Sequence, residues 1–210
     1  MQKRGNVMNI DNDDINELLD KYLIGKNVLE ERLTKLIDNF VKEHGYNPVE
    51  HFKSRIKCKD SIIKKLVNKN LDITIDNIVT NIKDVIGFRL VCSFLTDVYD
   101  IVNLISSKLN VNIIEKKDFI AKPKDSGYSS YHLIVLVPIE YKGKKDYVKA
   151  EIQIRTVAQD FWASLNHKIQ YKYEDLVPEN IKKEMYEYSL IVNQLDKRMV
   201  SLKNEVNGCK

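Results

Sequence analysis

The stretch from Glu151 to Tyr173, EIQIRTVAQDFWASLNHKIQYKY, joins a strand pattern directly to a helix pattern. Alternate side chains of a β-strand share one face, so Glu151, Gln153 and Arg155 point one way and the apolar residues between them point the other way. One explanation is a sheet with one face in water. The other is a polar surface that presents binding or catalytic groups.

The composition of the chain is that of an ordinary globular protein. It has 210 residues, 43% hydrophobic and 30% charged, and a net charge of +4. We therefore expect one domain, and the charge is weak evidence for a nucleic-acid partner. The N-terminus has no apolar signal segment, and the apolar runs are too short to span a bilayer. Three scattered cysteines indicate neither a disulfide framework nor a zinc site, so we expect a soluble, cytoplasmic protein with no membrane partner.

The spacing of apolar residues predicts an α+β fold. Helical spacing is found over residues 15–40, 60–70, 96–109 and 158–171, and again after Pro178. Strand patterns are found over residues 85–94, 111–115, 131–137 and 147–155. The last two strands flank PIEYKGKKD, which is typical of a hairpin connection, so that pair is expected to be antiparallel.

The segment KDVIGFRLVC carries two charged residues in an apolar setting. Asp84 precedes the predicted strand, and Arg89 lies within it, where an unpaired charge would be costly. Asp84 and Glu151 could converge on Mg²⁺, which uses few protein ligands and shares phosphate oxygens with a substrate. The alternative is two unrelated salt bridges.

The segment DFIAKPKDSGYSSYHLIV places cations and an aromatic ring in one loop. Lys122 and Lys124 suit phosphates as mobile point charges, and Tyr128 suits a flat base. The loop could therefore bind both the phosphates and the base of a nucleotide. The alternative is a solvated turn.

The segment SRIKCKDSIIKKL concentrates positive charge before and along a predicted helix. Arg55 could stack on a purine while Lys57 and Lys65 contact phosphates. Lys57 and Lys65 share a face only if the first turns are helical. The alternative is a solvated helix face.

Five motifs, in their order along the chain, resemble the synthetase domain of the RelA/SpoT family of (p)ppGpp synthetases, in the short stand-alone form called small alarmone synthetases. The motifs are HFKSRIK, KDVIGFRLVC, AKPKDSGYSSYH, EIQIRT and DFWASLNHKIQYKY, and the resemblance covers roughly residues 41–173. It implies a mixed, largely antiparallel sheet of about five strands flanked by helices, nucleotidyltransferase-like. We expect one domain over 1–210, with helical extensions over 10–40 and 178–207.

The resemblance implies transfer of the β,γ-pyrophosphoryl group of ATP to the ribose 3′-hydroxyl of GDP or GTP, giving ppGpp or pppGpp and AMP. GMP serves as acceptor in some members, and the sequence does not rank the acceptors. The family's hydrolase domains carry a His-Asp motif, and none of the four histidines here precedes an aspartate, so we expect synthesis without hydrolysis. Stand-alone relatives often form homotetramers through terminal helices, and the amphipathic stretch after Pro178 is the candidate interface.

The same resemblance gives each candidate residue a role. Asp84 and Glu151 resemble the Mg²⁺ ligands, and Glu151 also resembles the group that activates the attacking hydroxyl. The residues that resemble the ATP site are Arg55 and Arg89, around adenine, with Lys57 and Lys65 at the phosphates. The residues that resemble the guanosine-nucleotide site are Lys122, Lys124, Tyr128, His132, Gln153 and Asp160, with Tyr128 stacked on guanine.

Two residues of the motifs need separate comment. Asp160 stands where some relatives have Asn, and a carboxylate can accept but cannot donate an amide hydrogen bond. His132 alternates with apolar residues, so its alternative role is that of a structural strand residue. Phe161 and Trp162 are expected to pack in the core rather than touch substrate.

Two other classes of function compete with this one. A non-catalytic RNA- or nucleotide-binding module would use the same cations, but Asp84 and Glu151 would repel phosphate unless a metal intervened. Another nucleotidyltransferase would transfer a nucleotidyl group, but the chain lacks the Gly-Ser turn followed by closely spaced aspartates that is usual for that chemistry.

Overall fold

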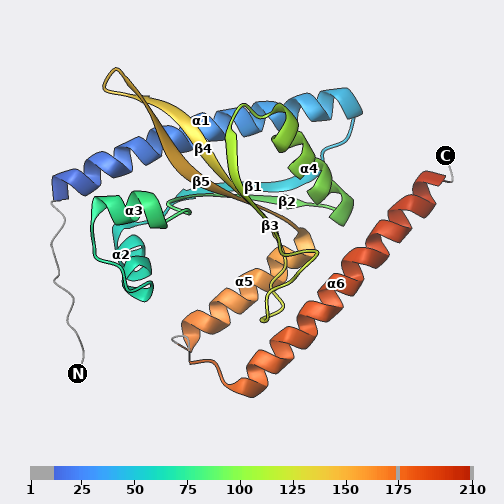
Figure 1. The fold of residues 1–210 in the computed structure, drawn as a ribbon. Coiled ribbons are helices and arrows are strands. Elements are labelled where there is room, and N and C mark those ends of the chain that lie inside the picture. The colour runs from blue at the N-terminus through green and yellow to red at the C-terminus, as the bar shows by residue number, and fades with distance from the viewer. Residues whose placement is uncertain (1–11, 174–175, 209–210) are drawn as a thin grey trace.

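A five-stranded mixed sheet forms the centre of the protein in the computed structural model, which describes residues 12–173 and 176–208 (Figure 1). The strands are β1 (Val49–Ile56), β2 (Ile86–Cys92), β3 (Asn112–Asp118), β4 (Tyr131–Tyr141) and β5 (Lys144–Thr156), in the spatial order β1-β2-β5-β4-β3. β2 and β5 are parallel, and the other neighbouring pairs are antiparallel. The predicted α+β fold with a largely antiparallel mixed sheet is confirmed.

One face of the sheet is covered by α1 (Asn12–His44) and α4 (Leu95–Lys108), which contact the central strands. Figure 1 shows α1 running along the length of the sheet. The apolar residues of β5 alternate, as the sequence predicts, and four of them point into this core: Val148, Ala150, Ile152 and Ile154 are each at most 5% exposed. Their burial turns the intervening polar residues to the opposite face.

The remaining helices lie around that polar face. They are α2 (Lys59–Asn68), α3 (Ile75–Asn81), α5 (Val157–Lys172) and α6 (Glu179–Gly208). α5 follows β5 without a loop, because Thr156 and Gln159 form reciprocal hydrogen bonds of 3.1 Å at its first turn. α5 then packs against the long α6 (Figure 1).

The start of α2 at Lys59 agrees with the helix predicted from residue 60, but other local features were missed or wrong. Residues 51–56 of the HFKSRIK segment lie in strand β1, which pairs with β2 and was not predicted. Lys57 therefore precedes the helix and does not share a helical face with Lys65. α3, which begins after the N-cap Thr74, was also not predicted. Trp162 is buried as expected, but Phe161 is 64% exposed because it projects from the open side of α5.

Helices occupy both predicted terminal extensions, although residues 10 and 11 lie outside the described residues. Residues 1–9, 174–175 and 209–210 also lie outside the described residues. The single domain over residues 1–210 therefore stays a prediction. Within residues 12–173 and 176–208, no helix combines the length and apolarity needed to cross a membrane.

Three polar contacts fix α6 against the rest of the protein. Trp162 Nε1 donates to the backbone oxygen of Met185 at 2.8 Å. Thr156 Oγ1 donates to Asp196 Oδ2 at 2.8 Å, and Asp196 is only 5% exposed. Near the end of the helix, Lys203 Nζ donates to the buried Asp97 at 2.7 Å. These contacts define one buried side of α6.

Asp196 provides a test of this packing. Burial raises the pKa of Asp196 to about 6, although the hydrogen bond from Thr156 acts in the opposite direction. Because the folded state binds this proton more tightly than the unfolded chain does, the group stabilises the fold at low pH, and that stability is lost as the pH rises through about 6. Asp196→Asn keeps an acceptor for Thr156 without the charge. We expect thermal unfolding to show a higher Tm for the variant at pH 8, corresponding to about 1–3 kcal/mol, and about half that difference at pH 5. Equal Tm shifts at the two pH values would contradict this account.

Candidate active site

A cleft of about 280 Å³ opens on the polar face of β1, β2 and β5. Its lining residues are Lys53, Ser54, Arg55, Asp84, Gly87, Phe88, Arg89, Glu151 and Gln153. The strand register explains this set, because Arg55 lies opposite Gly87 on one side and Glu151 lies opposite Gly87 on the other. Gly87 has no side chain, and a Cβ built there would lie 3.7 Å from Arg55 Cγ. The Arg55 side chain therefore lies directly over Gly87.

Asp84 lies at the edge of the cleft, just before β2, and pairs with two lysines. Lys65 Nζ is 2.7 Å from Asp84 Oδ1, and Lys57 Nζ is 3.2 Å from Oδ2. Burial opposes ionisation of Asp84, but the hydrogen bond from Lys65 and the charge of Lys57 outweigh it, so the pKa of Asp84 lies below its usual value. The carboxyl is therefore ionised at neutral pH. These ion pairs join the basic segment that contains Lys57 and Lys65 to the start of β2.

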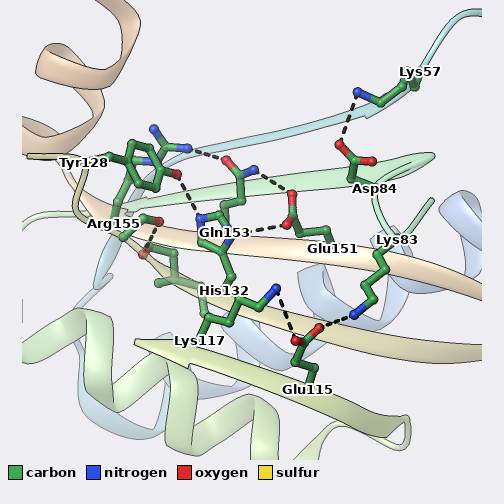
Figure 2. A network of polar contacts seen from close by, with 12 residues as sticks. Lys57, Lys83, Asp84, Glu115, Lys117, Tyr128, His132, Glu151, Gln153 and Arg155 are labelled. Carbon is green, nitrogen blue, oxygen red and sulfur yellow. Dashed lines mark hydrogen bonds and ion pairs between the residues drawn. The ribbon is translucent and has the colours of Figure 1, made fainter. Parts of the chain in front are cut away.

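Glu151 is the second carboxylate of the cleft, and both of its oxygens have partners (Figure 2). His132 Nδ1 lies 3.1 Å from Oε1, and Gln153 Nε2 donates to Oε2 at 2.8 Å. Burial opposes ionisation here too, but the hydrogen bonds from His132 and Gln153 prevail, and the pKa of Glu151 is lowered. An ionised carboxylate only accepts hydrogen bonds, so Nδ1 of His132 carries the proton.

The loop between β3 and β4 brings an aromatic ring to this carboxylate. Tyr128 Oη lies 2.9 Å from His132 Nε2, which accepts the phenolic hydrogen when the ring is neutral and protonated on Nδ1. Lys124 Nζ lies over the rings of Phe119 and Tyr128, 4.7 and 5.1 Å from their centroids. The loop thus combines a cation with an aromatic surface, as the sequence predicts. Lys122 and Lys124 are both exposed to solvent.

Asp160, in the first turn of α5, lies between two guanidinium groups. Its Oδ1 is 3.2 Å from Arg89 Nη1 and 3.6 Å from Arg155 Nη1. Arg89 therefore has the charge partner that its place in an apolar strand requires. This contact links β2 to the start of α5.

The structure thus connects most of the predicted site residues. The predicted ATP-site residues, with Asp84 and Glu151, line or border the cleft, and Tyr128, His132 and Gln153 surround Glu151. Sequence reasoning assigned no role to Arg155, which is buried beside Tyr128 and donates to Gln153 Oε1. Its position on the same strand face as Glu151 was the available signal.

A cluster beyond the cleft was also not predicted. Glu115 on β3 pairs with Lys83 at 2.8 Å and with Lys117 at 3.2 Å (Figure 2). Lys83 immediately precedes Asp84, and Lys117 lies opposite His132 in the β3–β4 register. This cluster extends the charged surface toward the edge of the sheet.

The carboxylates of the cleft suit a hard cation with few protein ligands. No group of three or more His, Cys, Asp or Glu side chains that could hold a metal occurs among the residues described. Two ionised carboxylates beside lysines fit Mg²⁺ held jointly by the protein and by substrate phosphates, rather than a site made of protein ligands alone.

Comparisons with known proteins agree with this geometry. Residues 54–176 match the family model described as a region found in RelA / SpoT proteins. GTP pyrophosphokinase YwaC of Bacillus subtilis (strain 168) is 42% identical over 192 residues, which cover 91% of this chain and 91% of YwaC. The crystal structure of small alarmone synthetase 1 from Bacillus subtilis matches with a TM-score of 0.84 at 30% identity, over 94% of this chain and 100% of that chain. A second structure of that synthetase, bound to its product pppGpp, matches with a TM-score of 0.80 at 31% identity, over 90% and 98%.

The chain belongs to the RelA/SpoT family. The resemblance carried by the five sequence motifs is therefore confirmed, and the structural matches extend over α1 and α6 as well as the sheet.

Gly127 allows a test of how the loop is held. Its φ is +84°, and an added Cβ would lie 2.1 Å from Ser189 Oγ and 2.6 Å from Ser189 Cβ on α6. Gly127→Ala should therefore lower the free energy of unfolding by about 2–4 kcal/mol in urea denaturation, because it adds a clash to an unfavourable φ.

Gly143→Ala is the matched control for this measurement. Gly143 also has a positive φ, of +73°, but nothing lies within 4 Å of its added Cβ. We expect that variant to lose only about 1 kcal/mol. Equal losses for the two variants would show that contact with α6 does not constrain the loop.

Proposed function

We infer that the protein is a (p)ppGpp synthetase that transfers the β,γ-pyrophosphoryl group of ATP to the ribose 3′-hydroxyl of GDP or GTP, with AMP as the second product. The observation that carries this proposal is the placement of Asp84 and Glu151 in one cleft, both with lowered pKa values. Family membership and the pppGpp-bound relative support the same reaction.

The donor side of the site consists of arginines and lysines around the cleft. Arg55 and Arg89 project from neighbouring strands into the cleft, where their planar groups can take adenine between them. Lys57 and Lys65 are the proposed phosphate ligands. Both contact Asp84 in this structure, so an incoming triphosphate would compete with that carboxylate for their hydrogen bonds.

Asp84 and Glu151 are the residues that would hold Mg²⁺. When bound, the ion would neutralise charge that develops on the transferring group. The two carboxylates supply the hard oxygen ligands that this ion prefers, and substrate phosphates and water would complete its coordination.

The acceptor side of the site surrounds Glu151 from β4, β5 and the loop. The proposed set is Lys122, Lys124, Tyr128, His132, Gln153 and Asp160, with guanine on the ring of Tyr128. Glu151 would accept the proton of the 3′-hydroxyl. Its lowered pKa makes it a weak base, which suffices because a loose transition state requires little activation of the attacking oxygen.

We expect the protein to assemble with further copies of itself, and we favour a homotetramer. The basis is an apolar stripe on α6, formed by Tyr188, Ile191, Leu195, Met199, Leu202 and Val206, each at least 44% exposed. These residues follow helical spacing and lie away from the buried Met185 and Asp196. A continuous exposed stripe of this kind is typical of an interface.

Leu195→Glu tests the apolar stripe. A charge buried in the interface would be costly, so light scattering coupled to gel filtration should show a smaller particle than the wild type. Lys197→Glu, at an exposed polar position on the other side of α6, should leave the mass unchanged. A wild-type protein that runs as a monomer would refute the assembly but not the activity.

The activity itself is tested by incubating the protein with Mg²⁺, ATP and GMP, GDP or GTP in turn, and separating the nucleotides by anion exchange. We expect AMP to form in step with a more highly charged guanosine product. Unchanged nucleotides over a range of metal concentrations would favour a non-catalytic nucleotide-binding module.

Glu151→Gln is the sharpest test of the site. The substitution preserves size but removes the charge needed for the metal and for proton acceptance, so we expect kcat to fall by at least about 10³-fold while the fold is retained. Glu140→Gln makes the same change at an exposed position on β4 and should retain wild-type turnover. Normal turnover by Glu151→Gln would refute the assignment.

A further inference from the structure

Five residues around Glu151 form a closed set of contacts, which we call the contact circuit (Figure 2). From Tyr128 it passes to His132 at 2.9 Å and on to Glu151 Oε1 at 3.1 Å. On the other side, Gln153 donates to Glu151 Oε2 at 2.8 Å and accepts from Arg155 Nη2. The circuit closes because the Arg155 guanidinium carbon lies 5.7 Å from the centroid of the Tyr128 ring.

Arg155 and Glu151 fix the orientation of the Gln153 amide from its two ends. A guanidinium has donors but no acceptor, so the Gln153 oxygen faces Arg155, and an ionised carboxylate only accepts, so the Gln153 nitrogen faces Glu151. Without Arg155, the amide oxygen would lose its charged donor, and only the contact with Glu151 would hold the amide in place.

Burying the Arg155 guanidinium at this position also costs free energy of folding. The residue is only 2% exposed, and its buried Nε has no hydrogen-bond partner among the described residues. Its nearest carboxylate, Asp160, is 3.6 Å away and is shared with Arg89. A buried charge with incomplete compensation destabilises the fold, so the contacts of Arg155 favour a contribution to the site over one to stability.

We propose that Arg155 is a positioning residue of the acceptor side: it holds the Gln153 amide and the Tyr128 ring in place, and through them it holds the Glu151 side chain in a single orientation. The inference rests on the proposed function, because it takes Glu151 as the group that receives the 3′-hydroxyl proton. Arg155 itself is buried beside the Tyr128 ring and does not line the cleft.

Arg155→Met tests the proposal, since Met has similar length but no donor and no charge. We expect kcat to fall about 10–100-fold and the KM for GDP to rise a few-fold, with a KM for ATP close to the wild-type value. A general loss of structure would instead raise the KM values for both substrates. Arg155→Lys keeps a charge and one donor, and should give an intermediate kcat.

The control and the double variant separate this role from a general structural one. Lys149→Met removes a cation from the same strand, where Lys149 donates to the backbone of Val79 and Thr80, and should leave kcat and the KM for GDP unchanged. In a Gln153→Leu background, Arg155→Met should cause a smaller loss of kcat than it does in the wild type, because only the part of its effect that passes through Tyr128 remains.

The outcomes distinguish the two proposals. A wild-type protein without synthetase activity would refute the proposed function. An active wild type whose Arg155→Met variant keeps the wild-type kcat and KM for GDP, or shows an equal loss with and without Gln153, would overturn the role of Arg155 alone. If Arg155→Met does not fold, Arg155→Lys is measured in its place, and a wild-type kcat and KM for GDP in that variant would overturn the proposal.

Discussion

The register of the parallel pair β2 and β5 is the constraint on which the rest of the site depends. It sets Gly87 opposite Glu151 and Arg89 opposite Gln153, while the β1 pairing sets Arg55 opposite Gly87. Because the apolar residues of β5 are buried under α1 and α4, all of these polar positions share the other face. A slip of one residue would turn Glu151 into the core, so the packing that stabilises the fold also selects the geometry of the cleft.

The two carboxylates of the cleft are compensated in different ways. Asp84 is held by the charges of Lys57 and Lys65, whereas Glu151 is held by hydrogen bonds from His132 and Gln153. Phosphates compete directly for lysines, so the surroundings of Asp84 are those that a nucleotide triphosphate would change. The partners of Glu151 can keep their contacts while one lone pair of each oxygen accepts another group. Asp84 can thus exchange its lysine partners when phosphates bind, whereas Glu151 keeps its partners and its orientation.

Much of this arrangement follows from the sequence, and the exceptions have physical reasons. Alternation in β5 predicted which side chains accompany Glu151, and the order of the motifs predicted the family and the expected sheet. Strand β1 was not recognised because its charged and partly exposed residues, VEHFKSRI, resemble a solvated segment, and its pairing with β2 decides its structure. The burial of Arg155 was equally invisible, because it depends on Tyr128 from a distant loop and on Asp160 from the next helix.

α6 contacts two segments that are distant from each other in the sequence, the loop between β3 and β4 and the start of α5. Its buried side packs Ser189 against Gly127, in the loop that carries Tyr128, and its Asp196 accepts from Thr156 at the start of α5. Its other side carries the apolar stripe. The Gly127 contact has no room for even a methyl group, and a close-packed contact of this kind cannot absorb a displacement of the helix without moving the loop. A shift of α6 would therefore also move the loop that carries Tyr128, and binding at the apolar stripe and binding at Tyr128 would be coupled only to the extent that either one shifted the helix.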